Sequence, residues 1–106
     1  MENATERRVA RRFTMALPLL VRLDNGTGII ERTEQTRDVS FRGIYFLTDR
    51  PYASGENIEF VLTLPREITM AGDVKIRCFG QVVRVESQSV PLGVAARIER
   101  YEFLPS

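Results

Sequence analysis

The chain has no histidine, only one cysteine and only one lysine. Without histidine it lacks the most common general base and the most common metal ligand of proteins, so zinc chemistry and Ser-His or Cys-His catalysis are excluded. Its acidic residues are scattered singly, without the spacing of a metal site or of an acid–base pair. We therefore expect a protein that is not an enzyme and that has no metal site and no cofactor.

A single cysteine, Cys78, excludes an internal disulfide. It stands between Arg77 and Phe79 in a run typical of a strand, where a buried thiol is the usual outcome. We expect Cys78 to be a structural residue of the core.

Long hydrophobic runs are missing as well. The longest apolar stretches, such as ALPLLV at residues 16–21, are far shorter than the roughly 20 residues of a membrane-spanning helix. The N-terminus also lacks the apolar region of a secretory signal. With 106 residues, of which 43% are hydrophobic, the chain suits one compact domain. We expect a cytoplasmic protein without membrane insertion, either a monomer or a weak dimer.

Arginine is the residue that the sequence has in excess. The formal net charge is only +1, yet fourteen of the fifteen basic residues are arginines, and nine of these precede residue 51. Arginine offers a planar fork of five N–H donors, which binds a guanine edge or a phosphate through two hydrogen bonds and stacks on flat rings. The bias predicts a ligand site in the first half of the chain, although a plain arginine-rich surface would have the same composition.

Apolar and polar residues alternate along most of the chain with a period of two, which is typical of β-strands. The pattern predicts six strands, at residues 17–23, 27–40, 44–48, 57–65, 73–87 and 89–103. Turn-forming sequences separate them, beginning with Asp-Asn-Gly at 24–26. No apolar stripe of helical period is present, and closing the sheet removes its exposed edges. We predict an all-β fold, a small six-stranded antiparallel β-barrel.

The two ends of the chain differ from the barrel pattern. Residues 1–13 are polar, charged and aperiodic, so we expect a flexible, arginine-rich N-terminal arm ahead of a barrel domain at 14–106. Residues 99–106 have room for at most one helical turn before Pro105. The fold should therefore have little or no C-terminal helix.

The strand at 27–40 is unusually polar. Its alternation puts Thr33, Gln35 and Arg37 on one face, and we expect most of the strand to be exposed to solvent.

Along the strand at 73–87, the residues expected to face the core switch from even-numbered to odd-numbered positions. Its apolar positions are even-numbered from Val74 to Cys78, and odd-numbered at Val83 and Val85. A β-bulge or sharp bend at Gly80 would account for the change.

Four arginines lie within the stretch ERRVARRF at residues 6–13, and three of them, Arg7, Arg8 and Arg12, form the pattern R-R-x-x-x-R. A short charge run on its own is usually a solvated surface segment.

A second pattern, D-x-S-x-x-G, is formed by Asp38, Ser40 and Gly43 between the second and third predicted strands. Asp and Ser commonly hydrogen-bond to the backbone of turns, and glycine permits a positive φ. Taken alone, such a pattern is found in many loops.

Together, the two motifs and the all-β remainder resemble the PilZ domain, a bacterial receptor family for cyclic di-GMP. The resemblance covers essentially the whole chain, and both motifs match without departure. The stretch VPLGVAARI at residues 90–98 is similar to the last barrel strand of that family. The resemblance implies a receptor or adaptor that binds cyclic di-GMP, orders its N-terminal arm over the nucleotide and signals to an unidentified downstream protein.

The resemblance also implies roles for the arginines of the arm. Arg7, Arg8 and Arg12 would grip guanine edges, stack on the rings and neutralise the phosphates. Arg11 lies outside the motif and is either a further contact or a solvated neighbour.

The second motif would complete the site. By the same resemblance, Asp38 would accept hydrogen bonds from N1 and N2 of guanine, and Ser40 would donate to a phosphate or a base. Gly43 would let the ligand or the arm approach the backbone. Arg42 is either solvated or an additional phosphate contact.

Two other functions remain compatible with the sequence. One is a PilZ-like adaptor that binds proteins without a nucleotide. The other is a barrel that binds single-stranded nucleic acid, which the near-zero net charge and the dispersed tyrosines and phenylalanines disfavour. We expect no nucleic-acid partner, and the sequence leaves open whether one nucleotide or two would bind.

Overall fold

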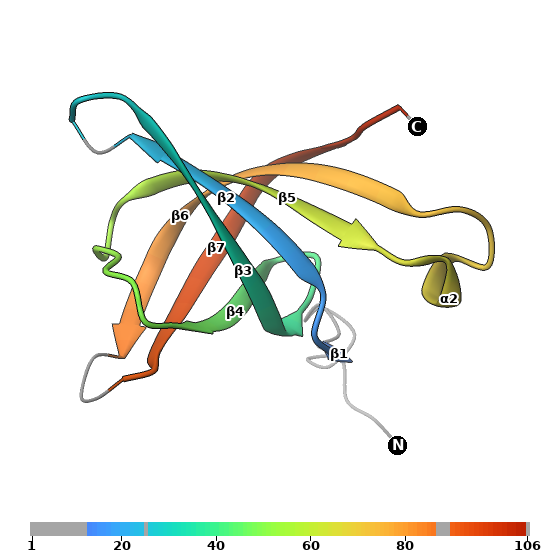
Figure 1. Cartoon of the computed structure of the whole chain (residues 1–106), viewed down its shortest axis with the longest axis horizontal. Coiled ribbons are helices and arrows are strands. Elements are labelled where there is room, and N and C mark those ends of the chain that lie inside the picture. The colour runs from blue at the N-terminus through green and yellow to red at the C-terminus, as the bar shows by residue number, and fades with distance from the viewer. Residues whose placement is uncertain (1–12, 25, 87–89, 106) are drawn as a thin grey trace, which may run out of the picture.

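The computed structural model of the chain describes residues 13–24, 26–86 and 90–105. Within these ranges it contains seven strands and one short helix (Figure 1). The strands are β1 (Phe13–Thr14), β2 (Pro18–Asp24), β3 (Ile29–Val39), β4 (Gly43–Thr48), β5 (Asn57–Leu64), β6 (Val74–Glu86) and β7 (Leu92–Phe103). Helix α2 (Arg66–Thr69) lies in the connection between β5 and β6.

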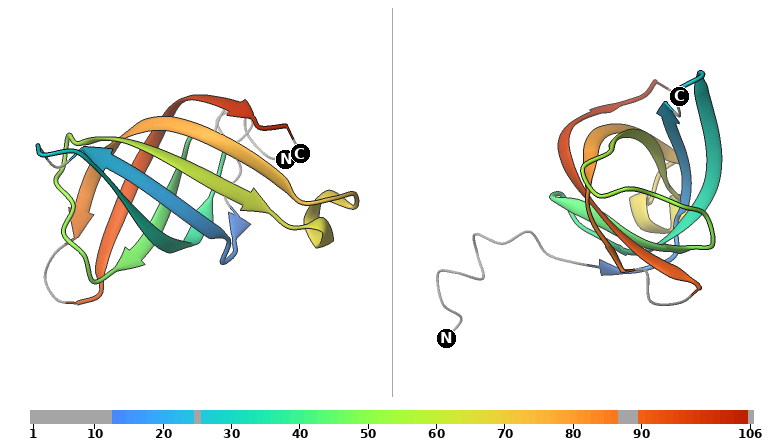
Figure 2. Two further views of the ribbon diagram at one scale, coloured as in Figure 1. Left: turned by 45° about the horizontal axis from the view of Figure 1, so that its top comes forward. Right: turned by 90° about the vertical axis from the view of Figure 1, so that its left-hand side faces the viewer.

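The strands form one antiparallel sheet that closes on itself (Figure 2). Their order is β1-β3-β2-β5-β6-β7-β4, and a further pairing of β3 with β4 joins the two ends of the sheet. Strands β2 to β7 are the six strands of the barrel, and β1 is a two-residue addition that pairs with the end of β3. The predicted all-β, six-stranded antiparallel barrel is confirmed.

The core is made by every second residue of the strands. The alternating apolar residues of the first and fourth barrel segments face inward. Leu64 is partly buried, and the others are at most 5% exposed: Leu17, Leu19, Val21, Leu23, Ile58, Phe60 and Leu62. Burying one side chain of this size contributes about 1.5–3 kcal/mol. A register slip by one residue would expose the whole set, so this pattern fixes how the strands pair.

The turn between β2 and β3 follows the predicted turn sequence. Gly26 has a φ of 95°, and its N–H donates to Oδ1 of Asp24 at 2.8 Å. Exposed and half-buried residues alternate along the polar strand β3, five of each, and Thr36 is its only buried residue, at 3% exposure.

The parity change in β6 differs from the prediction. A register shift does lie beside Gly80, but the even-numbered inward positions continue through it to Val82, which is fully buried. A second shift, between Val82 and Arg84, leaves Val83 42% exposed and turns Val85 back toward the core. The assignment of Val83 to the core was therefore wrong, because the residue that changes the parity is Val83 itself.

The C-terminal segment is strand, where the sequence left room for a helical turn. β7 runs to Phe103 and pairs with β6 as far as Ile76. The described residues up to 105 contain no C-terminal helix, which agrees with the prediction. None of the helices in the described ranges is long and apolar enough to cross a membrane.

One end of the barrel is an apolar opening of about 330 Å³. Three rings line it in succession, with centroid distances of 6.4 Å from Phe41 to Tyr101 and 6.0 Å from Tyr101 to Phe103. Phe41 and Phe103 are 75% and 63% exposed, so apolar surface is open to solvent at this end.

Candidate functional site

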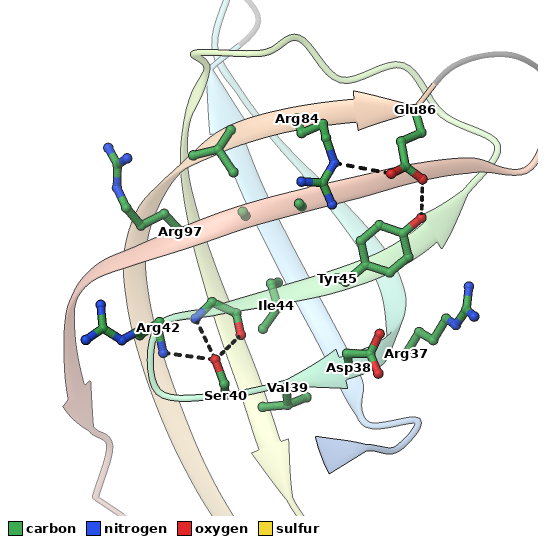
Figure 3. Close-up of a pocket in the computed structure, with 14 residues that line it drawn as sticks. Arg37, Asp38, Val39, Ser40, Arg42, Ile44, Tyr45, Arg84, Glu86 and Arg97 are labelled. Carbon is green, nitrogen blue, oxygen red and sulfur yellow. Dashed lines mark hydrogen bonds and ion pairs between the residues drawn. The ribbon is translucent and has the colours of Figure 1, made fainter. Parts of the chain in front are cut away.

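A polar hollow of about 480 Å³ lies on the outside of the barrel, across the neighbouring strands β3, β4, β7 and β6 (Figure 3). Its lining residues are Arg37, Asp38, Val39, Ser40, Arg42, Gly43, Ile44, Tyr45, Val83, Arg84, Glu86, Ala95, Ala96 and Arg97. Four arginines thus face two carboxylates, which gives the hollow an excess of positive charge although the whole chain is nearly neutral.

Asp38 lies where three segments of chain meet. Its Cα partners are Thr14 on β1 and Tyr45 on β4. The hydroxyl of Thr14 donates to Oδ1 of Asp38 at 3.0 Å. The carboxylate is therefore held at the rim of the hollow, directly beside the first described residues of the chain.

Ser40 organises the loop that carries it. Its Oγ accepts from the backbone N–H groups of Arg42 and Gly43, at 3.1 and 3.2 Å, and its own N–H donates to the carbonyl of Gly43 at 2.9 Å. The lone pairs of the hydroxyl thus stabilise the tight turn. The hydroxyl proton has only a long contact of 3.4 Å with the carbonyl of Gly43, so it is the part of Ser40 that a ligand could use.

Gly43 lies where the loop packs against β7. Its φ is not positive. A Cβ at this position would fall on the carbonyl oxygen of Ala96 in β7. The space that glycine leaves is therefore taken by the neighbouring strand, which closes the loop against the barrel.

The hollow gathers arginines that the sequence motifs do not contain. Arg42, a secondary candidate from the sequence, lines it together with Arg37, Arg84 and Arg97. Arg97 is the Cα partner of Gly43 and contacts Gln81 at 2.9 Å. Arg37 and Arg42 are neighbours of Asp38 in the sequence, whereas only the pairing of β4, β7 and β6 brings Arg84 and Arg97 to the hollow, so no spacing in the sequence could have indicated those two.

Tyr45 links the middle of the hollow to its far edge. Its hydroxyl donates to Oε1 of Glu86 at 2.7 Å, and Oε2 of the same carboxylate accepts from Nε of Arg84 at 3.2 Å. The hydrogen bond from Tyr45 lowers the pKa of Glu86, and the same hydrogen bond raises the pKa of Tyr45. Glu86 is therefore ionised and Tyr45 is neutral near pH 7.

The arginines of the first motif cannot be placed. Arg7, Arg8, Arg11 and Arg12 lie outside the described residues. Within the described ranges, no three His, Cys, Asp or Glu side chains are grouped so that they could hold a metal ion.

The structure is thus a small closed β-barrel with a charged hollow on its outer wall. The family model for the PilZ domain matches residues 6–102, which include both motifs, and the chain belongs to this family.

A solved structure with the same fold is that of the Bacillus subtilis inhibitor of motility (MotI/DgrA). The TM-score is 0.72 at 19% sequence identity, and the match covers 91% of this chain and 44% of that chain. The chain thus spans less than half the length of that protein, and at this identity the likeness concerns the fold alone. No curated protein matches the chain.

Proposed function

We propose that this protein is a cyclic di-GMP receptor, which signals to a downstream protein by ordering residues 1–13 over the bound nucleotide. The observation that carries the proposal is the pairing of β1 with the end of β3. Phe13 lies opposite Val39, and Arg12 is the residue before Phe13. The described chain therefore begins, directly after the last arginine of the motif, beside the strand residues Asp38 and Val39 that lead into the D-x-S-x-x-G loop.

The two motifs suit the two edges of guanine. Guanine presents O6 and N7 as adjacent acceptors, which one arginine fork fills with two hydrogen bonds. The N1 and N2 donors on the other edge need an acceptor, and Asp38 supplies a carboxylate at the rim of the hollow. Adenine carries a donor at position 6 and lacks the N2 donor, so this combination selects guanine.

The charge of the hollow suits the rest of the ligand. Cyclic di-GMP carries two phosphates with one negative charge each, and arginine binds phosphate bidentately. Arg42, the chain neighbour of Gly43, and Arg97, its partner in β7, line the hollow and carry such forks in addition to Arg7, Arg8 and Arg12. One terminal amino group of Arg97 already contacts Glu99 at 3.0 Å.

Isothermal titration with cyclic di-GMP tests the proposal. We expect binding by the wild type, and a loss of about ten- to hundredfold in affinity for Arg8→Ala and for Arg12→Ala, since one bidentate contact is worth about 1–3 kcal/mol. Asp38→Ala should weaken binding at least about tenfold, because it removes a charged acceptor.

Matched variants outside the hollow control for charge. Arg50→Ala and Asp49→Ala change the same charges at exposed positions that do not line it, and both should bind like the wild type. GTP and cyclic di-AMP should bind weakly or not at all. If Arg8→Ala, Arg12→Ala and Asp38→Ala all keep wild-type affinity, the assigned site is wrong.

A second candidate function is an adaptor that binds a protein without a nucleotide. The observation in its favour is the apolar opening, where Phe41, Tyr101 and Phe103 expose contiguous apolar surface of the kind that often marks a protein contact. Absence of any heat or spectral change with cyclic di-GMP, in a protein shown to be folded, would favour this adaptor function over the receptor.

A further inference from the structure

The ring of Tyr45 lies across strand β7 instead of projecting into solvent. Its Cα partner in β7 is Ala95, and the residue two positions along on the same face is Gly93. A Cβ on Gly93 would collide with the Tyr45 hydroxyl and would come within 2.8 Å of Cζ of the ring. The ring thus rests on Gly93, and only the small residues at 93 and 95 leave room for it.

The far end of the ring is fixed as well. Glu86 is the Cα partner of Gly93 in β6, so the ring crosses β7 and reaches the next strand, where its hydroxyl donates to Glu86 at 2.7 Å (Figure 3). Glu86 is in turn held by Arg84 at 3.2 Å. Both ends of the tyrosine are therefore anchored, which gives a rigid ring with one face on the sheet and the other toward the hollow.

We propose that Tyr45 is a stacking platform on which a guanine base of the bound nucleotide lies, an inference that rests on the proposed cyclic di-GMP site. Aromatic side chains that lie flat on a β-sheet bind the faces of bases in this way. The guanidinium of Arg37 stands over the Tyr45 ring with Cζ 5.8 Å from its centroid, at the outer limit of a cation–π contact. Arg37 is exposed and can cover the second face of the base.

The edges of the platform carry the polar groups that guanine needs. Asp38 on β3 lies at one side of Tyr45, and Arg84 on β6 lies at the other. β3 and β6 are three strand spacings of about 4.8 Å apart, or about 14 Å. This distance leaves room for an aspartate, a purine and an extended arginine side by side. The ion pair with Glu86 uses Nε of Arg84, so the terminal amino groups of the fork lie outside that pair and suit O6 and N7 of the base.

The test compares three tyrosine variants by isothermal titration with cyclic di-GMP. Tyr45→Leu removes the ring and should weaken binding about tenfold or more. Tyr45→Phe keeps the ring and loses only the hydroxyl, so its affinity should stay within about threefold of the wild type. Tyr101→Leu is the matched control, because Tyr101 lines the apolar opening and not the hollow.

A spectroscopic signal separates stacking from a general structural effect. Proton NMR of the nucleotide should show an upfield shift of guanine H8 on binding, caused by the ring current of Tyr45. The shift should persist with Tyr45→Phe and disappear with Tyr45→Leu, whose own folding is checked by its unfolding temperature. Gly93→Ala, which lifts the intact ring from the sheet, should also reduce the shift.

The outcomes distinguish the two proposals. If the wild type binds and Tyr45→Leu binds equally well with the same H8 shift, the platform is wrong while the receptor function stands. If the folded wild type does not bind cyclic di-GMP at all, the receptor function fails, and this inference fails with it.

Discussion

At the scale of single residues, Gly43 shows how tightly the candidate site is built into the barrel. Its missing side chain lets the D-x-S-x-x-G loop close against the carbonyl of Ala96, and no positive φ is involved. The glycine is thus needed for the architecture of the loop even before any ligand binds.

Gly43→Ala should lower the free energy of unfolding by about 1–3 kcal/mol, because the added methyl group must displace backbone of β7. The control is Gly72→Ala, where a Cβ would meet nothing within 4 Å and φ is not positive. That change should be neutral or should stabilise by up to about 1 kcal/mol. Urea unfolding measures both, and equal stability of the two variants would contradict the close contact at Gly43.

The buried thiol of Cys78 should make the free energy of unfolding depend on pH in the alkaline range. Burial raises its pKa from 9.0 to about 11. A group whose pKa is raised in the folded state contributes stability that is complete below the pKa of the unfolded chain and is lost as the pH rises. The free energy of unfolding should therefore fall by up to about 1.4 kcal/mol per pH unit between these two values.

Cys78→Ala removes this titration while leaving every other group in place. Its stability should depend less on pH than that of the wild type above pH 9.0, whatever its stability at neutral pH. Urea unfolding under reducing conditions gives the free energy of unfolding at each pH. If this free energy depends on pH equally in both proteins, the pKa of Cys78 is the same in the folded and the unfolded chain, and the prediction is wrong.

At the scale of elements, the junction between β1, β2 and β3 attaches the first described residues of the chain to the barrel. Thr36 is its key residue, because Oγ accepts from the N–H of Leu17 and donates to the carbonyl of Met15, both at 2.8 Å. Thr36 is 3% exposed, so water cannot replace these partners. This one hydroxyl connects the backbone at Met15 and Leu17 to β3, the strand that carries Asp38.

Thr36→Val keeps the shape of the side chain but leaves the two backbone groups unpaired. It should destabilise the barrel by about 1–3 kcal/mol and should speed hydrogen exchange at Leu17. Thr33→Val, on the exposed face of the same strand, should change stability by less than about 0.5 kcal/mol. Equal effects of the two substitutions would show that the buried hydroxyl contributes nothing specific.

Elements with a strictly alternating pattern could be predicted from the sequence. β2 and β5 each bury one face, so the alternation of their apolar residues in the sequence shows which residues face the core and thereby sets the register. β6 was predicted less well, because Val82 and Val83 are identical residues and only the pairing with β7 shows which of them bulges outward. A bulge depends on the partner strand, which a local pattern does not contain.

The candidate site was predictable only where it is local in sequence. Asp38, Ser40 and Gly43 form one short loop and line the hollow together. Tyr45 lies two residues after Gly43, whereas Arg84 and Glu86 reach the same hollow only through the pairing of β4 with β7 and of β7 with β6, which no local pattern contains. The hydrogen bonds of Ser40 within its own loop were also unpredictable, since they depend on the conformation of the turn.

At the scale of the whole molecule, charge is distributed unevenly over a nearly neutral protein. The net charge is +1, whereas four arginines and two carboxylates line the hollow. Other arginines are neutralised on the barrel surface, such as Arg22 and Arg77, which both contact Glu59 at 3.5 and 3.3 Å. This concentration of arginines at the hollow fits the proposed binding of a small anion.

Salt dependence tests this view. Affinity for cyclic di-GMP should decline only gently with salt, because two phosphates are involved. A protein that contacts about 6–10 phosphates of a nucleic acid loses about 10³–10⁵ in affinity between roughly 50 and 200 mM salt. A loss of that size for the dinucleotide, or tighter binding to single-stranded DNA or RNA, would indicate a nucleic-acid-binding barrel.

We propose that the arginine motif and the D-x-S-x-x-G loop hold cyclic di-GMP between them. The most direct measurement is the set of ¹H–¹⁵N spectra of the full chain during titration with cyclic di-GMP. We expect large shifts for residues 38–43 and for Tyr45, together with changes at Arg7, Arg8 and Arg12, while strand β5 stays unchanged. Saturating nucleotide that leaves the loop and the arginines unaffected, or that shifts only residues elsewhere on the barrel, would contradict it.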